Sequence, residues 1–239
     1  MTTEFGYSVR VKSGAGWRAF PRVRLMVSVG QEYHEGKKLA AVVAWINRNP
    51  GIAEVHVSVN DHLQRHNLLA AGVDAGEAGR RSRAEGSLWL ARNQSALAAI
   101  SAGLVVTRWQ DWTGRLEFDG VRRALADQLR ADPVLEQAVE TDAQALAARK
   151  TRRGEGVPAS WIGHSRDYVR EELAVFALQC ASLPAAEIYP GSNLASAAYL
   201  VGRKGLRDEI RPLAGRHFTR IDFARIDATP ALRPAPRLG

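Results

Sequence analysis

A strand, a helix and a second strand follow one another near the start of the chain. Residues 23–29 (VRLMVSV) form an apolar, β-branched-rich run that Gly30 ends, and residues 36–47 continue with apolar positions at helical spacing. Residues 54–59 (EVHVSV) alternate between polar and apolar side chains, as strands do. This order predicts the first crossover of a parallel α/β sheet.

Similar patterns run through the rest of the chain. The elements that they predict are a helix at 77–102, a strand at 104–106, two helices within 119–149 that divide at Asp132-Pro133, a helix at 161–182, an extended segment at 187–189 and a strand at 217–223. Residues 1–21 read as an irregular segment, and residues 228–239, with three prolines, as a disordered tail. We therefore expect residues 1–239 to form one α/β domain, with a mostly parallel sheet flanked by helices.

The composition is typical of a globular protein from a reducing compartment. Of the 239 residues, 46% are hydrophobic and 24% are charged, and no apolar run is long enough to span a bilayer. The N-terminal residues lack the apolar core of a signal peptide. The one cysteine, Cys180, excludes an internal disulfide and lies in an apolar run, which predicts a buried structural thiol. We expect a cytoplasmic protein without a membrane partner.

The chain carries a formal net charge of +8, mostly from arginine. Such an excess favours polyanionic partners such as nucleic acid, although the codon bias of a GC-rich genome produces the same excess. Four arginines, Arg80, Arg81, Arg83 and Arg92, fall on the predicted helix 77–102. They form either a solvated helix face or a basic ridge that contacts phosphates.

Ser28 lies at the carboxyl end of the first predicted strand, where open α/β sheets bind their ligands. A hydroxyl group there, beside a helix N-terminus, is a candidate nucleophile, although serine before glycine is also ordinary turn chemistry. The hydrolase motif G-x-S-x-G is absent, because Met26 stands where the first glycine would be. The dinucleotide motif G-x-G-x-x-G is also absent, because Gly30 and Gly36 are too widely spaced.

The histidines give little support for a metal site. His62 and His66 are spaced like metal ligands, but no acidic or cysteine ligand accompanies them, so no metal is expected. His56 falls within a predicted strand and is expected to pack in the core. His34 begins a helix and is expected to be exposed, so it is not assigned as the base for Ser28.

Three groups far from Ser28 in the sequence support chemistry at that residue. Tyr168 and Glu172 are spaced i, i+4 and present a phenol and a carboxylate on one helix face. Tyr189, followed by Pro190, closes the short extended segment. Taken in this order, the set resembles the tRNA-dependent cyclodipeptide synthases, whose pattern contains a Ser-x-Gly turn after the first strand, a Tyr-x-x-x-Glu pair and a later tyrosine.

The resemblance covers roughly residues 23–223 and is closest to the Pro-type subgroup of that family. Pro190 follows the tyrosine where the His-type subgroup has histidine, and Gln31 stands where that subgroup has asparagine. Met26 replaces a glycine of many His-type members, which implies a different first aminoacyl pocket. The aromatic and basic residues that follow the serine in the family correspond to Tyr33, His34 and Lys37.

The resemblance implies a Rossmann-like fold similar to the catalytic domains of class I aminoacyl-tRNA synthetases, especially the tyrosyl and tryptophanyl types. The nucleotide-binding signatures of those synthetases are missing, since the sequence has no HIGH-like or KMSKS-like segment. The ester of an aminoacyl-tRNA is already activated, so the implied reaction needs no ATP. No cofactor is expected.

The implied reaction joins the aminoacyl groups of two aminoacyl-tRNAs into a cyclic dipeptide, a 2,5-diketopiperazine, by a ping-pong sequence. Ser28 would carry first an aminoacyl group and then a dipeptidyl group. By the family's assignments, Tyr168 and Glu172 hold the ammonium group of the first aminoacyl moiety, and Tyr189 positions the serine ester. The residues expected to bind substrate are Met26, Gly30, Gln31, Tyr33, Glu172 and Pro190.

Other parts of the implied machinery are less specific. Backbone N–H groups around Gly30 and Gln31 are expected to stabilise the oxyanion. The base that deprotonates Ser28 stays open, with a substrate ribose hydroxyl or phosphate as candidates. The tRNA contacts are expected from Arg80, Arg81, Arg83 and Arg92, without sequence readout. We expect the protein to act as a monomer.

Three other functions stay open at this point. The first keeps the tRNA substrate and Ser28 but transfers the aminoacyl group to another acceptor, which gives a non-cyclic amide. The second is a serine hydrolase, which needs a late histidine, either His164 or His217, and a nucleophile elbow that is missing. The third is a non-enzymatic RNA-binding α/β domain in which Ser28 is only a turn residue.

Overall fold

The computed structural model describes residues 6–150 and 157–226. The strands are β1 (Tyr7–Ser13), β2 (Arg22–Ser28), β3 (Glu54–Asn60), β4 (Gly103–Arg108), β5 (Ala186–Tyr189) and β6 (His217–Arg225). The α-helices are α1 (Gly36–Asn47), α2 (Arg65–Ala70), α3 (Ala75–Ala98), α4 (Trp109–Thr113), α5 (Phe118–Ala131), α6 (Pro133–Lys150), α7 (Ala159–Ser182) and α8 (Ala195–Leu200).

The strands form one six-stranded sheet in the order β1-β6-β5-β2-β3-β4. The neighbours from β6 to β4 are parallel, and β1 is antiparallel to β6 at one edge. The chain passes from β2 to β3 and β4 in one direction, and α4 to α7 then return it to β5 on the other side of β2. The carboxyl ends of β2 and β5 therefore meet at the topological switch point, where sheets of this kind bind ligands.

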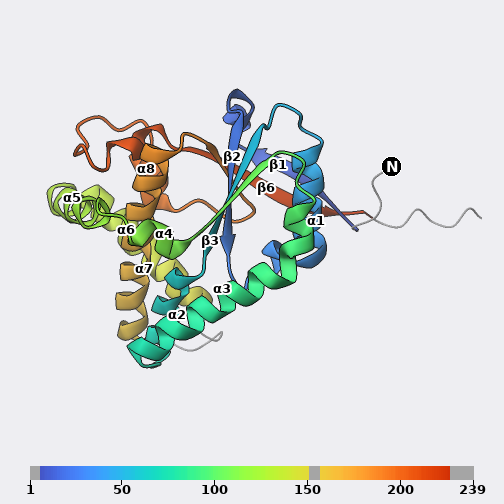
Figure 1. The fold of residues 1–239 in the computed structure, drawn as a ribbon. Coiled ribbons are helices and arrows are strands. Elements are labelled where there is room, and N and C mark those ends of the chain that lie inside the picture. Colours follow the sequence, from blue (N-terminus) through green and yellow to red (C-terminus); the bar gives the residue numbers. More distant parts are fainter. Residues whose placement is uncertain (1–5, 151–156, 227–239) are drawn as a thin grey trace, which may run out of the picture.

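Helices cover both faces of the sheet, as Figure 1 shows with α1 on one side and α7 and α8 on the other. The fully buried residues Val23, Leu25 and Val27 of β2 belong to the apolar cluster that includes Trp89 of α3. Met26, which points to the opposite face, belongs to the cluster formed with α5, α6 and α7. Alternate residues of one strand thus contribute to two separate cores.

The sheet face toward α7 also contains buried polar side chains. Arg24 donates from its Nη2 atom to the backbone carbonyl oxygens of Gln179 (2.9 Å) and Leu183 (2.8 Å) at the end of α7. The Nε2 atom of His56 lies 2.9 Å from the Thr107 hydroxyl oxygen. His56 is buried, which confirms that it packs in the core.

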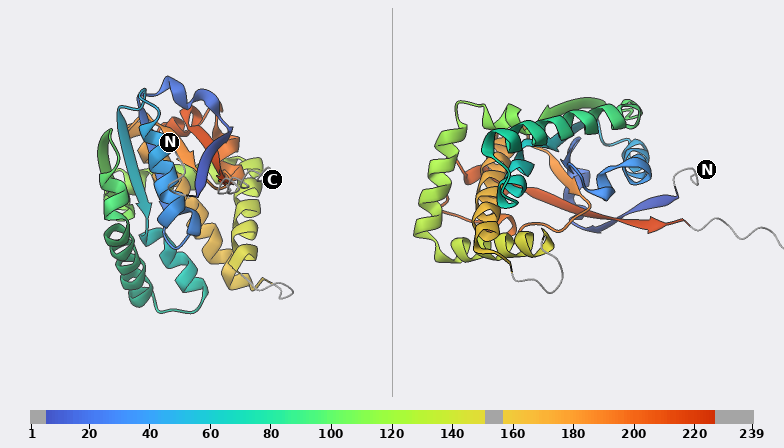
Figure 2. Two further views of the ribbon diagram at one scale, coloured as in Figure 1. Left: turned by 90° about the vertical axis from the view of Figure 1, so that its right-hand side faces the viewer. Right: turned by 90° about the horizontal axis from the view of Figure 1, so that it is seen from below.

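The elements predicted between residues 22 and 226 are confirmed, with ends that shift by a few residues. The interpretation of residues 1–21 as irregular is wrong for the described part, because Tyr7–Ser13 forms β1. This strand pairs with β6, more than 200 residues later, and β1 and β6 lie side by side in Figure 2. Its half-exposed, charged side chains hide the alternation that marks a buried strand. The tail at 228–239 lies outside the described residues.

The short helix α8 is an element that the sequence pattern did not indicate. The carboxylate of Asp142 on α6 accepts hydrogen bonds from the backbone N–H groups of Ala195 and Ser196, both at 2.8 Å. It also accepts one from the Ser196 hydroxyl at 2.6 Å. Since the capping carboxylate comes from a distant helix, no local signal marks the start of α8. Among the described residues, no helix is both long and apolar enough to cross a membrane.

Candidate active site

Ser28 ends β2 at the switch point, where a tight turn follows it. The residue is 8% exposed. Gly30 adopts a φ of +82°, a conformation that glycine reaches without a steric penalty. The Gln31 N–H group donates to the carbonyl oxygen of Ser28 at 3.2 Å. The turn therefore ends the strand and leaves the Ser28 side chain on the wall of a cavity.

A chain of hydroxyl groups holds the Ser28 side chain. Its Oγ atom lies 3.1 Å from the hydroxyl oxygen of Tyr189, which in turn lies 3.1 Å from the hydroxyl oxygen of Tyr33. Burial, with a smaller effect of Tyr33, raises the pKa of Tyr189 well above its ordinary value, so the phenol keeps its proton. Gly191 fits against this ring because a Cβ atom there would lie 3.0 Å from Cδ1 of Tyr189.

Tyr168 and Glu172 of α7 face the same cavity, which measures about 90 Å³. The hydroxyl oxygen of Tyr168 accepts a hydrogen bond from Gln64 Nε2 at 3.3 Å. The predicted site residues that line this cavity are Met26, Ser28, Tyr33, Tyr168, Glu172 and Tyr189. The fold therefore brings together the Ser28 hydroxyl group, three phenols and a carboxyl group from four different elements.

The carboxyl group of Glu172 is the unusual acid of the cavity. Burial raises its pKa from the ordinary 4.5 to about 8, and the nearby Glu187 adds to the rise while Arg216 opposes it. The group is therefore mostly protonated near neutral pH as long as the cavity is empty of cations. A cation entering the cavity would favour the ionised form.

A buried ion pair forms part of the cavity wall. Arg216 binds Glu187 through two hydrogen bonds, Nε to Oε2 at 3.0 Å and Nη2 to Oε1 at 2.6 Å. It also donates from Nη1 to Asn193 Oδ1 at 2.7 Å, and its guanidinium lies 4.5 Å from the centre of the Phe176 ring. Because Arg216 is paired in this way, it does not neutralise Glu172.

Three predicted substrate-binding residues lie beside the cavity rather than on its wall. Among the described residues, those that line the cavity do not include Gly30, Gln31 or Pro190. Gly30 and Gln31 form the turn after Ser28, and Pro190 follows Tyr189. The Gln31 N–H group, which was expected to stabilise the oxyanion together with that of Gly30, donates to the Ser28 carbonyl oxygen in this structure.

The expectation that His34 is exposed is also wrong. His34 ends a short 3-10 turn (Glu32–His34), is 1% exposed and accepts a hydrogen bond at Nδ1 from the Ser28 backbone N–H group at 2.9 Å. Burial lowers the pKa of the imidazole to about 3, so the ring is a neutral acceptor. Trp89 of α3 donates from Nε1 to the His34 carbonyl oxygen at 3.0 Å. His34 therefore holds the backbone of the turn and does not contact the Ser28 hydroxyl.

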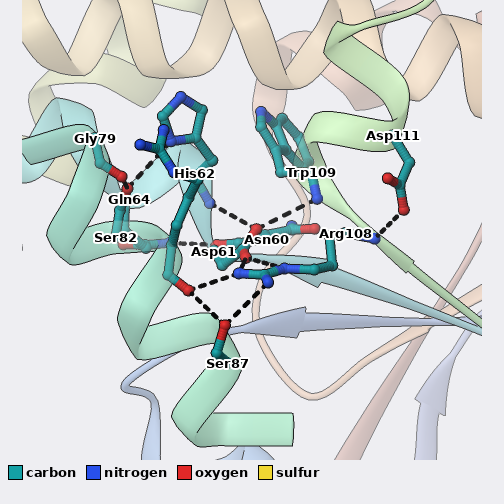
Figure 3. Close-up of polar contacts among 11 residues, drawn as sticks. Asn60, Asp61, His62, Gln64, Gly79, Ser82, Ser87, Arg108, Trp109 and Asp111 are labelled. Atoms are coloured by element: carbon teal, nitrogen blue, oxygen red, sulfur yellow. Dashed lines mark hydrogen bonds and ion pairs between the residues drawn. The ribbon is translucent and has the colours of Figure 1, made fainter.

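Asp61 holds Arg108, which donates to the Ser87 hydroxyl oxygen of α3 at 3.0 Å at the carboxyl edge of the sheet (Figure 3). It follows β3 directly, is 0% exposed and forms an ion pair with Arg108 at the end of β4. Its carboxylate also accepts hydrogen bonds from the backbone N–H groups of His62 (2.7 Å) and Trp109 (3.3 Å). Gly86 of α3 leaves room for this carboxylate, since a Cβ atom there would lie 2.7 Å from Asp61 Cγ.

The four arginines proposed as phosphate contacts lie on α3 and do not line the cavity. The exposed ones are Arg80, Arg81 and Arg92, and the half-buried one is Arg83. Arg80 pairs with Glu77 at 2.8 Å, and Arg92 pairs with Glu35 at 3.2 Å. Exposed ion pairs of this kind contribute little to stability, so these guanidinium groups can exchange partners at low cost.

The two histidines with metal-like spacing bind protein groups instead. His62 Nδ1 lies 3.2 Å from the Ser82 hydroxyl oxygen, and His66 Nε2 lies 3.2 Å from Glu171 Oε2. Across residues 6–150 and 157–226, no three or more histidine, cysteine, aspartate or glutamate side chains gather to hold a metal ion. Cys180 is half-buried, less enclosed than its apolar run predicts, and burial raises the pKa of its thiol.

Sequence reasoning did not select several polar residues on or next to the cavity wall. Asn60 is the last residue of β3, so its place at the carboxyl edge, beside Ser28, could be read from the strand pattern. Gln64, which binds Tyr168, lies four residues later. The pair of Glu187 and Arg216 left no such signal, because it forms only when β5 and β6 pair.

Comparison with known proteins points to one family. The family model described as cyclodipeptide synthase matches residues 17–183 of the chain, well over half of its length. No curated protein matches the sequence. The matched range includes Ser28, Tyr168 and Glu172, while Tyr189 lies just beyond it.

Solved structures show the same fold. A cyclodipeptide synthase from Fluoribacter dumoffii superposes with a TM-score of 0.80 at 21% identity, covering 92% of this chain and 100% of that one. A Mycobacterium tuberculosis protein, whose structure is described as showing that cyclodipeptide synthetases are related to type I tRNA synthetases, superposes with a TM-score of 0.68 at 18% identity. The match covers 94% of this chain and 96% of that one. A cyclodipeptide synthase from Candidatus Glomeribacter gigasporarum bound to Phe-tRNAPhe superposes with a TM-score of 0.61 at 19% identity, covering 91% of this chain and 93% of that one. The sheet and its helices are thus arranged as in solved cyclodipeptide synthases.

Proposed function

The chain belongs to the cyclodipeptide synthase family, and on that premise we propose that it joins the aminoacyl groups of two aminoacyl-tRNAs into a 2,5-diketopiperazine through esters of Ser28. The observation that carries this proposal is the placement of Ser28. Its hydroxyl group ends a strand at the switch point, binds Tyr189 and shares a cavity with Tyr168 and Glu172. The relative with bound Phe-tRNAPhe supports the class of substrate.

The first step loads the enzyme. The Oγ atom of Ser28 attacks the carbonyl carbon of an aminoacyl-tRNA ester, and a new ester bond forms. The bond between that carbon and the ribose oxygen of the tRNA breaks, and the ribose oxygen takes the proton that Ser28 loses. No ATP is needed, because one ester replaces another.

The second and third steps make the two amide bonds. For the dipeptide to stay on Ser28, the amine of the bound aminoacyl group attacks the ester of the second aminoacyl-tRNA, whose ribose oxygen leaves with a proton. The new terminal amine then attacks the Ser28 ester, which closes the ring and returns a proton to Oγ. The last step is intramolecular, so the position of the chain in the cavity supplies much of its rate.

Glu172 and Tyr168 receive the amino group of the first aminoacyl moiety. A carboxylate binds an ammonium group through a charge-assisted hydrogen bond. Because burial raises the pKa of Glu172 to about 8, the same group can take a proton from the ammonium near neutral pH and leave a free amine to attack. Tyr189, which keeps its proton, holds the Oγ atom during these steps.

The basic face of α3 binds the tRNA backbone in this proposal, through Arg80, Arg81, Arg83 and Arg92. The helix is joined to this edge of the sheet by Arg108, which Asp61 holds, and to the Ser28 turn by Trp89. Binding here is electrostatic and does not read sequence. We also assign the chain to the Pro-type subgroup, on Pro190 and on Gln31 in the turn.

The test compares spent medium from bacteria that express the wild type, Ser28→Ala or the control Ser95→Ala, whose side chain is exposed on α3. We expect a new diketopiperazine by mass spectrometry with the wild type and the control, and none with Ser28→Ala. A linear or mixed amide would instead indicate an aminoacyltransferase with another acceptor. If all three cultures made the same products, or if the purified wild type carried no aminoacyl adduct, the non-enzymatic RNA-binding role would be favoured instead.

A further inference from the structure

Two backbone donors of the Ser28 turn already have partners within it. The Ser28 N–H group donates to His34 Nδ1 at 2.9 Å, and the Gln31 N–H group donates to the Ser28 carbonyl oxygen at 3.2 Å. When Ser28 attacks an ester, negative charge develops on the former carbonyl oxygen of the substrate. Stabilising that charge requires a positioned hydrogen-bond donor, and neither of these two N–H groups is free to supply it.

Asn60 is the neighbour of Ser28 on the side away from Tyr189. Parallel pairing places Ser28 opposite Asn60, each the last residue of its strand, while β5 flanks β2 on the other side. Paired residues of adjacent parallel strands point to the same face, and the strands lie roughly 4.8 Å apart. The Asn60 side chain therefore reaches the space beside the Ser28 hydroxyl.

The side-chain amide of Asn60 is a buried polar group in the cavity. The residue is 1% exposed and lines the same cavity as Ser28. Within the part of the chain that the structure describes, its Oδ1 atom has no hydrogen-bond partner, and the bond from Gln64 Nε2 (3.3 Å) goes to its backbone carbonyl. The Oδ1 atom can only accept, and no hydrogen bond joins Nδ2 to another described residue. Since buried side-chain amides are nearly always paired, this N–H group is open to a partner on the substrate.

The backbone of Asn60 is held in place by the residue that follows it. Asp61 binds Arg108 and the N–H group of Trp109, and Figure 3 shows Asn60 directly beside this cluster. A donor fixed in this way costs little reorganisation when charge appears at the substrate. The geometry thus supplies a preorganised amide on the β3 side of Ser28 and a phenol on the β5 side.

We propose that Asn60 is a catalytic residue whose side-chain N–H group donates to the oxyanion formed on Ser28, an inference that rests on the function proposed above. The Oγ atom of Ser28 bonds to the ester carbon, and the electron pair of the carbonyl bond moves to the oxygen that Asn60 contacts. That pair then restores the carbonyl as the bond to the tRNA ribose breaks, and the ribose oxygen takes the serine proton. Ring closure passes through the same position.

The test measures the first step in a single turnover, with enzyme in excess over the aminoacyl-tRNA whose residue occurs in the wild-type product. Rapid quenching follows loss of the tRNA ester and gain of mass on Ser28. Asn60→Ala and Asn60→Asp are compared with Asn47→Ala, which removes an exposed amide on α1. Removing one oxyanion donor typically slows a reaction about 100- to 1,000-fold, and we expect that loss for both Asn60 variants.

A binding measurement separates this role from substrate binding, using an amide-linked analogue of the same aminoacyl-tRNA. We expect unchanged affinity for both Asn60 variants and an unchanged melting temperature for Asn60→Ala, whereas the buried carboxyl group of Asn60→Asp should lower the melting temperature. A wild-type rate in either variant, or a loss confined to affinity, would overturn the inference. A normal rate or tighter binding of the analogue by Asn60→Asp would show that the side chain at position 60 accepts a hydrogen bond from the substrate ammonium group instead. Adduct formation by the wild type is measured first. If the wild type forms no adduct, the proposed function fails, whereas failure of this inference shows only in the rates of the Asn60 variants.

Discussion

The hydroxyl oxygens of Ser28 and Tyr189 lie 3.1 Å apart, although 161 positions separate the two residues in the chain. The contact exists because β5 pairs directly with β2 at the switch point of the sheet. Tyr33 extends the contact into a line of three hydroxyl groups. Because the pKa of Tyr189 is raised well above its ordinary value, that phenol acts as a neutral hydrogen-bond partner of Ser28.

Replacement of Tyr189 by phenylalanine tests this partner. Loss of one neutral hydrogen bond, worth about 1 kcal/mol, should slow aminoacylation of Ser28 roughly five- to tenfold. Tyr33→Phe is the matched control, since Tyr33 reaches Ser28 only through Tyr189, and it should have a smaller effect. Single-turnover rates check both variants. Equal losses would contradict a direct role of Tyr189.

Glu172 should make the stability of the free protein depend on pH. Its pKa is raised from 4.5 to about 8, so the folded state keeps a proton that the unfolded state loses. The contribution is full below pH 4.5, falls as pH rises toward 8 and is level above it. Urea denaturation at several pH values should show this fall for the wild type relative to Glu172→Gln. Parallel pH profiles of the two proteins would exclude the shift.

Two substitutions of His34 test the acceptor that holds the Ser28 turn. The side-chain oxygen of asparagine can occupy roughly the place of Nδ1, whereas that of glutamine reaches the place of Nε2. His34→Gln should therefore leave the Ser28 N–H group unpaired and cost about 1–3 kcal/mol of unfolding free energy. His34→Asn should cost less and keep more activity. The reverse order would show that the ring acts through Nε2.

The exposed arginines of α3 should control the salt dependence of tRNA binding. Arg81→Ala should weaken binding modestly and lower the slope of log K against log salt by about one unit if it contacts one phosphate. Fluorescence anisotropy with labelled tRNA at several salt concentrations measures this slope. Arg220→Ala, an exposed arginine on β6, is the control and should leave the slope unchanged. Equal slopes for all three proteins would move the tRNA site away from α3.

Two glycines of α3 should respond in opposite ways to alanine. At Gly86 a Cβ atom would lie 2.7 Å from Asp61 Cγ, so Gly86→Ala should push α3 away and cost about 1–3 kcal/mol. At Gly79 the nearest atom is 3.4 Å away, on the flexible side chain of Arg83, so Gly79→Ala should be neutral or stabilising by up to about 1 kcal/mol. Chemical denaturation compares the unfolding free energies of the two variants. Similar values would argue against close packing of Gly86 on the Asp61 side chain.

The local pattern of the sequence already predicted most of the helices and strands. Residues 36–47 form α1 at the predicted positions, and the helix break at Asp132-Pro133 separates α5 from α6. The i, i+4 spacing of Tyr168 and Glu172 placed both on one face of α7. These inferences succeed because helix period, strand alternation and proline geometry act over a few residues.

Residues whose environment comes from distant parts of the chain were harder to predict. His34 looked exposed at the start of a helix, yet Trp89 and the Ser28 turn bury it. Residues 7–13 looked irregular because their partner strand, β6, is remote and their side chains are half-exposed. The sequence alone determined a strand that ends in a serine and a helix that presents a phenol and a carboxyl group. The tertiary structure decided that these meet Tyr189 and Asn60 in one cavity, because strand order and helix docking depend on burying all the apolar faces together.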